Sequence, residues 1–190
     1  HRATAREVLA GPPAIRLCPP VLRRARLIVT EIPGGAGEKG AEAVRARLEA
    51  LGMEMAGPVT VPHRTAPLAE AIGRAEEDLI LILTGSATSD SHDVAPSALV
   101  QAGGRLEHFG MPVDPGNLLF LGALGTRPVI GLPGCARSPA LNGAAWGLSR
   151  IACGLTGTGE DIAGVGVGGW LKAIPPPPQP RSRRRDEAGS

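Results

Sequence analysis

The order of apolar and polar positions predicts strands that alternate with helices. Residues 79–83 are an unbroken run of Leu and Ile, which predicts a strand buried on both faces. Shorter apolar or β-branched runs predict strands at 26–30 and 59–61. Apolar positions recur with helical spacing, between charged residues, in 41–51 and 65–77. Because parallel strands need crossover connections, this order favours a parallel sheet covered by helices.

The second half of the chain continues the pattern. The expected elements are a helix beginning near Pro96, a short strand within 105–111, hairpin strands at 117–121 and 128–132, and a helix over 138–155 that Ser138 caps and Pro139 begins. We therefore expect an α/β fold, a three-layer sandwich with a mostly parallel central sheet flanked by helices, and a short β-hairpin.

The chain of 190 residues fits one domain with flanking segments. Gly and Pro within 1–25 predict a linker or a packed arm, and the domain proper is expected over 26–173. The glycine-spaced segment 164–172 fits either a last strand or a loop. Residues 174–190 are rich in Pro and Arg, which predicts a disordered tail or an interdomain linker. Because the sequence starts at His1 without a Met, a fragment of a longer protein is one interpretation.

Composition narrows the classes of partner. The chain is 43% hydrophobic but has only two Phe, two Trp and no Tyr, which argues against an aromatic platform for single-stranded nucleic acid. The net charge is +2 with Arg gathered near the ends, so no nucleic-acid partner is expected. No apolar run reaches the roughly 18 residues of a membrane span. The three cysteines are far apart and lack a Cys-x-x-Cys, which argues against a disulfide framework or a zinc site. Their pattern favours the reducing cytoplasm as the compartment.

The segment 84–93 is the first candidate site because it follows the central strand and precedes a helix. Ligands of open parallel sheets bind beyond the carboxyl ends of the strands. Small residues let a ligand approach the backbone, and the start of a helix favours an anion such as a phosphate. The alternative is an ordinary structural turn.

Segment 84–98 reads Thr-Gly-Ser-Ala-Thr-Ser-Asp-Ser-His-Asp-Val-Ala-Pro-Ser-Ala. It resembles, without a gap, the Thr-Gly-Gly-Thr-Gly-x-x-x-Arg-Asp-Val-Thr-Pro-x-Ala signature of the molybdopterin-binding domain family. Residues 34–40 resemble the family's first loop, and 113–117 and 131–134 resemble two loops of its molybdenum-insertion members. The resemblance covers about residues 26–155, with the motifs in the right order.

A longer pattern, 108–117 together with 132–142, is similar to one subgroup of that family. In this subgroup the molybdopterin-binding domain precedes a nucleotidyltransferase domain of the molybdenum-cofactor cytidylyltransferase type. The resemblance therefore implies a fused or separate nucleotidyltransferase partner. Relatives differ in oligomeric state, so a homo-oligomer is also an open expectation.

The chain departs from the family pattern at several positions. Two glycines of the family loop are replaced within Gly85-Ser86-Ala87-Thr88, and Glu38 stands where the adenylyltransferases carry Asp. His92 stands in place of Arg, which lowers the fixed positive charge. The segment 135–137 replaces an Asn-Pro. These departures are compatible with pterin binding more readily than with metal-dependent transfer.

The resemblance implies roles for individual residues. Asp93 and Glu38 would be catalytic, with Asp93 as a ligand of Mg²⁺, and the molybdopterin-binding residues would be Thr84, Gly85, Ser86, Thr88, Ser91, Asp114, Gly116, Asn117, Pro133 and Gly134. Each has an alternative: Asp93 as a helix N-cap, Glu38 and Asp90 as solvated loop charges, and Asp114 and Asn117 as turn formers. Cys135 is either a reactive thiol or a small buried residue, and His63 and His108 are interpreted as surface or satisfied core histidines.

Three functions stay open at this point. The leading hypothesis is a module that binds molybdopterin, with or without molybdenum, and presents it to the nucleotidyltransferase domain. The second is an enzyme that uses Mg²⁺ and ATP to adenylylate molybdopterin or to insert molybdate. The third is a scaffold that has kept the fold and lost the ligand.

Overall fold

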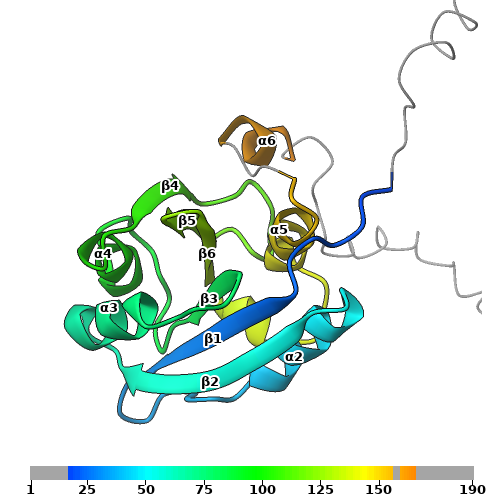
Figure 1. Cartoon of the computed structure of the whole chain (residues 1–190). Helices are drawn as coiled ribbons and strands as arrows, with labels where there is room; N and C mark the ends of the chain where they lie inside the picture. The colour runs from blue at the N-terminus through cyan, green and yellow to red at the C-terminus, as the bar shows by residue number, and fades with distance from the viewer. Residues whose placement is uncertain (1–16, 156–158, 166–190) are drawn as a thin grey trace, which may run out of the picture.

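The computed structural model describes residues 17–155 and 159–165, which form an α/β domain around a six-stranded mixed sheet (Figure 1). The strand order is β2-β1-β3-β6-β5-β4. All the strands point the same way except β5, which is antiparallel to both neighbours. The strands are β1 (Arg24–Glu31), β2 (Glu54–Pro62), β3 (Leu79–Leu83), β4 (Arg105–Phe109), β5 (Phe120–Leu124) and β6 (Arg127–Leu132).

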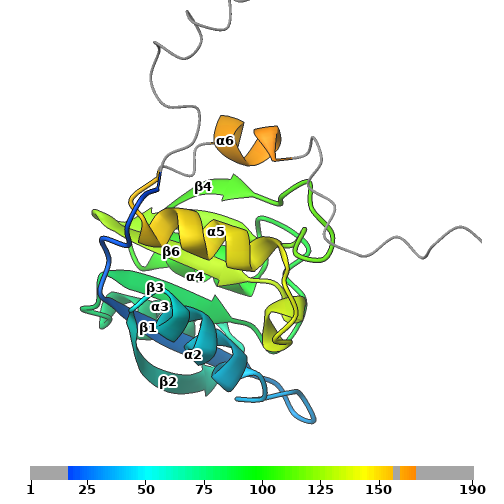
Figure 2. The ribbon, with the colours of Figure 1, turned by 90° about the vertical axis from the view of Figure 1, so that its right-hand side faces the viewer.

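Helices cover both faces of the sheet, which gives the expected three layers (Figures 1 and 2). The helices α2 and α5 pack on one face, and α3 and α4 pack on the other. The helical elements are α2 (Ala41–Ala50), α3 (Thr65–Gly73), α4 (Val94–Gln101), the 3-10 helix η1 (Gly134–Arg137), α5 (Gly143–Ala152) and α6 (Gly159–Gly164). No helix among these is long and apolar enough to cross a membrane.

The central strand β3 shows how the sequence specifies the layers. Leu79, Leu81 and Leu83 belong to the hydrophobic cluster under α2 and α5. Ile80 and Ile82 belong to the cluster under α3 and α4. All five are fully buried, and burial of each such side chain is worth about 1.5–3 kcal/mol. The prediction of a strand buried on both faces is confirmed.

Several element boundaries differ from the prediction. The strand β1 begins at Arg24, two residues inside the expected arm, and β2 begins at Glu54 instead of residue 59. The helix expected over 65–77 ends at Gly73. The expected hairpin is present, but Gly122 lies within β5 and not in the turn. A Cβ at Gly122 would lie 2.4 Å from the carbonyl oxygen of Arg105, so glycine permits close approach of β4 there.

The predicted cap of the last long helix was wrong. This helix, α5, begins at Gly143, and Asn142 caps it by accepting a hydrogen bond from the Ala145 amide at 3.2 Å. Ser138 and Ala140 instead lie in an irregular segment, because their carbonyl groups accept hydrogen bonds from Arg47. Leu141 was expected on the buried face and is 58% exposed. The expectations for residues 1–16 and 166–190 lie outside the described residues.

Candidate functional site

The candidate site lies at the edge of the sheet where the like-directed strands end. The loops that follow β1, β3, β4 and β6 carry all the residues predicted from the sequence. The loop after β1 leads to α2 on one face, whereas the loop after β3 leads to α4 on the opposite face. Adjacent loops therefore diverge between β1 and β3, which is where open α/β sheets bind ligands.

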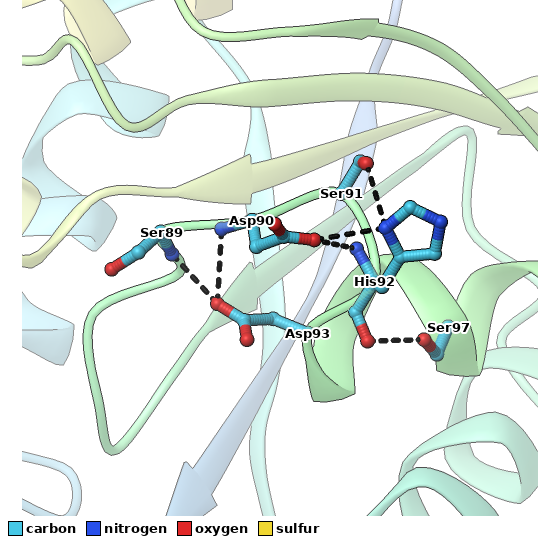
Figure 3. A network of polar contacts seen from close by, with 6 residues as sticks. All are labelled: Ser89, Asp90, Ser91, His92, Asp93 and Ser97. Carbon is cyan, nitrogen blue, oxygen red and sulfur yellow. Dashed lines mark hydrogen bonds and ion pairs between the residues drawn. The ribbon is translucent and has the colours of Figure 1, made fainter.

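Asp93 organises the loop after β3 (Figure 3). Its Oδ2 accepts hydrogen bonds from the backbone N–H groups of Ser89 at 2.7 Å and Asp90 at 3.1 Å. Asp93 occupies the N-cap position of α4, yet its side chain makes no capping hydrogen bond to that helix. The carboxylate thus stabilises the loop that precedes the helix, which differs from the capping interpretation; its role as a ligand of Mg²⁺ stays a prediction.

Asp90 and His92 form a second, exposed interaction in this loop (Figure 3). Asp90 Oδ1 accepts the backbone N–H of His92 at 2.7 Å and lies 2.9 Å from His92 Nδ1. The backbone hydrogen bond, followed by the side-chain contact, lowers the pKa of Asp90. Ser97 Oγ donates to the His92 carbonyl at 2.8 Å, which fixes the first turn of α4 against the loop.

The predicted hydroxyl groups differ in their access to a ligand. Thr84 and Thr88 are buried, and Thr84 Oγ1 donates to the carbonyl oxygen of Ser86 at 2.6 Å. Ser91 Oγ lies 3.3 Å from a ring nitrogen of His92. Ser86 is exposed. Of these four groups, Ser86 is therefore the best placed to meet a ligand from solvent.

Three successive backbone amides in this loop lack a partner among the residues that the structure describes. The N–H groups of Ser86, Ala87 and Thr88 have no hydrogen-bond partner within the described part of the chain. Backbone N–H groups need partners, and consecutive free amides make a concavity suited to an anion. The start of α4, which follows in the same loop, adds the positive end of its dipole.

Arg137 joins three loops. Its Nη1 donates to the carbonyl oxygens of Gly37 at 2.8 Å and Lys39 at 2.5 Å, and its Nη2 donates to that of Thr84 at 2.9 Å. Burial lowers the pKa of Arg137. Gly40 makes room for this side chain, since a Cβ there would lie 2.5 Å from Arg137 Cβ and its φ is +93°. A single guanidinium therefore sets the spacing of the loops after β1, β3 and β6.

Arg47 holds the loop after β6 from the side of α2. Its guanidinium donates to four main-chain carbonyl groups, those of Ala43, Ala136, Ser138 and Ala140. Burial lowers the pKa of Arg47, and the nearby Cys135 partly opposes that effect. Partial burial also raises the pKa of the half-buried Cys135 thiol, which disfavours the thiolate and hence the reactive-thiol interpretation.

The two predicted catalytic carboxylates face different partners. Glu38 is exposed and accepts a hydrogen bond from Thr60 Oγ1 on β2 at 2.8 Å. No hydrogen bond links it to Asp93 in the described residues. In residues 17–155 and 159–165, no group of three or more His, Cys, Asp or Glu side chains is arranged to hold a metal ion.

The remaining predicted residues lie in the loops after β4 and β6. Gly116 is buried with φ +124°, and a Cβ there would lie 2.4 Å from the Gly143 nitrogen, so this glycine permits contact with the start of α5. Asp114 and Asn117 are exposed in the same loop. In the loop after β6, Pro133 is buried before η1 and Gly134 is exposed.

Sequence reasoning gave no role to Thr30, Arg47 and Arg137, and it interpreted His63 only as a surface or satisfied core histidine. His63 contacts Thr30 Oγ1 through Nδ1 at 2.7 Å and Ser86 Oγ through Nε2 at 2.9 Å. Thr30 Oγ1 in turn accepts the Gly85 N–H at 2.9 Å. The only available signal was that His63 follows a strand end, and β2 was predicted to end at residue 61.

Two pockets lie apart from these loops. One, of about 600 Å³, is lined by residues of β5 and α5 such as Leu121 and Ile151. The other, of about 330 Å³, lies between β2 and α3 beside Val61 and Ala71. Neither is lined by a predicted site residue.

The fold and the site define an α/β domain whose loops gather at the carboxyl edge of its sheet. Residues 25–142 match the family described as "Probable molybdopterin binding domain". The chain belongs to this family, which is a domain family of molybdenum cofactor biosynthesis. No curated protein matches the chain in sequence.

Two solved structures are similar to this chain. One is the molybdopterin biosynthesis MoeA protein from Pyrococcus horikosii, with a TM-score of 0.52 and 20% identity. The match covers 72% of this chain and 37% of that protein, so the chain spans well under half of its length. The other is molybdenum cofactor biosynthesis protein B, with a TM-score of 0.49, 15% identity, and coverage of 72% of this chain and 97% of that one. At 20% identity, the first likeness shows the fold alone.

Proposed function

We propose that this domain binds molybdopterin, either metal-free or carrying molybdenum, at the carboxyl edge of its sheet. The main observation that supports this proposal is that the amides at 86–88 have no partner within residues 17–155 and 159–165, in a loop that Arg137 fixes between its neighbours. Molybdopterin carries a phosphate group, and free backbone amides near a helix start are a suitable site for a phosphate. The exposed Ser86 hydroxyl supplies a further donor beside them.

The other loops would receive the rest of the ligand. The loops after β4 and β6 leave Asp114, Asn117 and Gly134 exposed at the same edge of the sheet. Their polar groups are available to the ring system of a pterin. In this assignment Asp93 shapes the phosphate loop through the Ser89 and Asp90 amides and needs no metal.

The proposal includes a nucleotidyltransferase partner, fused or separate, to which the domain presents the pterin. The resemblance of residues 108–117 and 132–142 to the fused subgroup supports this part. The exposure of Ser86, Asp114 and Asn117 at this edge would also leave the ligand within reach of a second domain. The cysteines Cys18, Cys135 and Cys153 are free, which fits the reducing cytoplasm as the proposed compartment.

Titration of the domain with molybdopterin tests the proposal, with and without ATP and Mg²⁺. Two substitutions separate the roles of Asp93. Asp93→Asn keeps an oxygen that accepts the Ser89 and Asp90 amides and removes the charge. Asp93→Ala removes the acceptor. We expect saturable binding by the wild type without nucleotide or metal, near wild-type affinity for Asp93→Asn, and roughly tenfold weaker binding for Asp93→Ala.

Glu49→Gln on the exposed side of α2 is the matched control, because it also neutralises a surface carboxylate, and it should bind as the wild type does. An adenylylated product that forms with ATP and Mg²⁺ and is abolished by Asp93→Asn would show a metal-dependent transferase instead of a carrier. Absence of binding by the wild type would leave only the scaffold.

A further inference from the structure

A chain of hydrogen bonds joins β1, the end of β2 and the loop after β3. The Gly85 N–H donates to Thr30 Oγ1 at 2.9 Å, and Thr30 Oγ1 lies 2.7 Å from His63 Nδ1. The other ring nitrogen of His63, Nε2, lies 2.9 Å from Ser86 Oγ. The histidine therefore connects a buried threonine to an exposed serine of the candidate site.

The surroundings of Thr30 decide where the protons lie. Thr30 is fully buried, and its oxygen already accepts the Gly85 amide. Its own hydroxyl proton needs an acceptor, because an unsatisfied buried donor is costly. Among the described residues, His63 Nδ1 is the group placed to accept it. Nδ1 must then be unprotonated, and the ring proton of the neutral imidazole lies on Nε2.

A proton on His63 Nε2 determines the direction of the hydrogen bond to Ser86. If Nε2–H donates to Ser86 Oγ, the serine oxygen is an acceptor within the protein. The Ser86 hydroxyl proton has no acceptor among the described residues and is free to point into solvent. The backbone N–H of Ser86, adjacent to those of Ala87 and Thr88, also has no partner in the described ranges.

The charge state of the ring agrees with this direction. Burial lowers the pKa of His63, and the carboxylate of Asp93 partly opposes that effect. A neutral ring at neutral pH follows. A protonated ring would donate from both nitrogens and leave the Thr30 proton without an acceptor.

The geometry points to His63 as a positioning residue that fixes the Ser86 hydroxyl as a hydrogen-bond donor toward the phosphate of the bound ligand. A serine held in this way favours a group that only accepts, such as an ionised phosphate oxygen, over a group that donates. The identity of the ligand as molybdopterin rests on the proposed function above. The direction of the hydrogen bonds is a property of the free protein.

Binding measurements on a double-mutant cycle test the coupling of the two residues. We expect Ser86→Ala and His63→Phe each to weaken molybdopterin binding about tenfold, and the double variant to bind no more weakly than Ser86→Ala. His63→Gln should recover most of the loss, because its amide can donate near the position of Nε2. His108→Gln on β4 is the control and should bind as the wild type does.

Nitrogen NMR of the His63 ring in the ligand-free protein gives an independent readout. The expected result is a proton on Nε2 and none on Nδ1, and a proton on Nδ1 alone would overturn the inference. Wild-type binding that His63→Phe leaves unchanged would also overturn it while preserving the proposed function. Failure of the wild type to bind molybdopterin would refute the proposed function and, with it, the role of His63 toward that ligand.

Discussion

The two edges of the sheet use their polar groups in different ways. At the amino edge, Asp78 Oδ2 accepts the backbone amides of Arg23 and Arg24 at 2.8 and 3.0 Å. Glu77, only 5% exposed, forms a two-point ion pair with Arg26. At the carboxyl edge, the guanidinium groups bind carbonyl oxygens, and the amides at 86–88 have no partner in the described part of the chain.

This difference in how the polar groups are paired indicates a structural role for the amino edge and a binding role for the carboxyl edge. At the amino edge, charges of opposite sign cancel within the chain and the strand-end amides are satisfied, which serves stability. Neither Arg47 nor Arg137 forms an ion pair within the described residues, so their charges are not cancelled by a bound carboxylate. The amide donors at 86–88, which have no partner among the described residues, favour an anionic ligand at the carboxyl edge.

The largest expected effect is the loss of stability when the Glu77–Arg26 ion pair at the amino edge is removed. Glu77→Gln removes the charge that compensates the partly buried Arg26, whose side chain is 27% exposed. Loss of one partner of a buried pair costs about 3–5 kcal/mol, and the exposure of Arg26 places the expected loss near the lower limit, about 3 kcal/mol. Urea unfolding measures it, and molybdopterin affinity should not change.

Glu76→Gln, at the exposed neighbouring position, is the control and should alter stability by less than about 0.5 kcal/mol. An equal loss in the two variants would show that the Arg26 pair contributes nothing specific.

Arg137→Met removes the hydrogen bonds that join three loops at the carboxyl edge, and we expect a smaller loss of stability than for Glu77→Gln. Three carbonyl groups lose their donor, so we expect about 1–2 kcal/mol lower stability and roughly tenfold weaker molybdopterin binding, since the loop after β3 is no longer fixed. Arg137→Lys should recover little, because an ammonium group cannot reproduce the planar fork. Arg74→Met, at the exposed position that follows α3, is the control, and equal affinities for Arg137→Met and Arg74→Met would contradict the assigned role.

The smallest expected effect is on the pH dependence of the free energy of unfolding, to which His63 at the carboxyl edge and Glu77 at the amino edge contribute in different pH windows. The lowered pKa of His63 makes the folded state bind its proton less readily, so its contribution is complete above the ordinary pKa of 6.5 and is lost as the pH falls below it. Burial acts to raise the pKa of Glu77, but hydrogen bonds from Arg26 and the backbone outweigh it and lower that pKa below 4.5. The Glu77 contribution is therefore lost only in a more acidic window, as the pH falls through the folded pKa.

Unfolding free energies measured across these two windows provide the test. His63→Gln should reduce the pH dependence of the free energy of unfolding only in the window below pH 6.5. Glu77→Gln should reduce it only in the more acidic window below pH 4.5. A change of both windows by either variant would contradict the separation of the edges.

The framework of the fold was predictable because it depends on local patterns. The apolar run of β3 and the helical spacing of α2 each specify their element within a few residues. The helix expected over 65–77 ended early, at Gly73, and Glu77 and Asp78 bind groups at the start of β1 instead of continuing a helical face. Such partners lie more than fifty positions away and leave no periodic signal.

The candidate site was predictable only in part, for the same reason. The small hydroxyl residues and the glycine after β3 predicted a candidate binding loop, and the resemblance of residues 84–98 to the family signature supported the same position. The groups that hold the loop were not predicted, because Arg137 reaches the Gly37 carbonyl across 100 positions and Arg47 reaches Ala136 across 89. Main-chain acceptors of this kind have no residue type by which a sequence could reveal them.

Amide chemical-shift mapping during a molybdopterin titration tests the central claim most directly. The account predicts that the largest saturable changes fall on the amides of Ser86, Ala87 and Thr88, while those of Arg23 and Arg24, already bound to Asp78, stay unchanged. Saturable changes centred on the amino edge or on either pocket, with residues 86–88 unaffected, would contradict it.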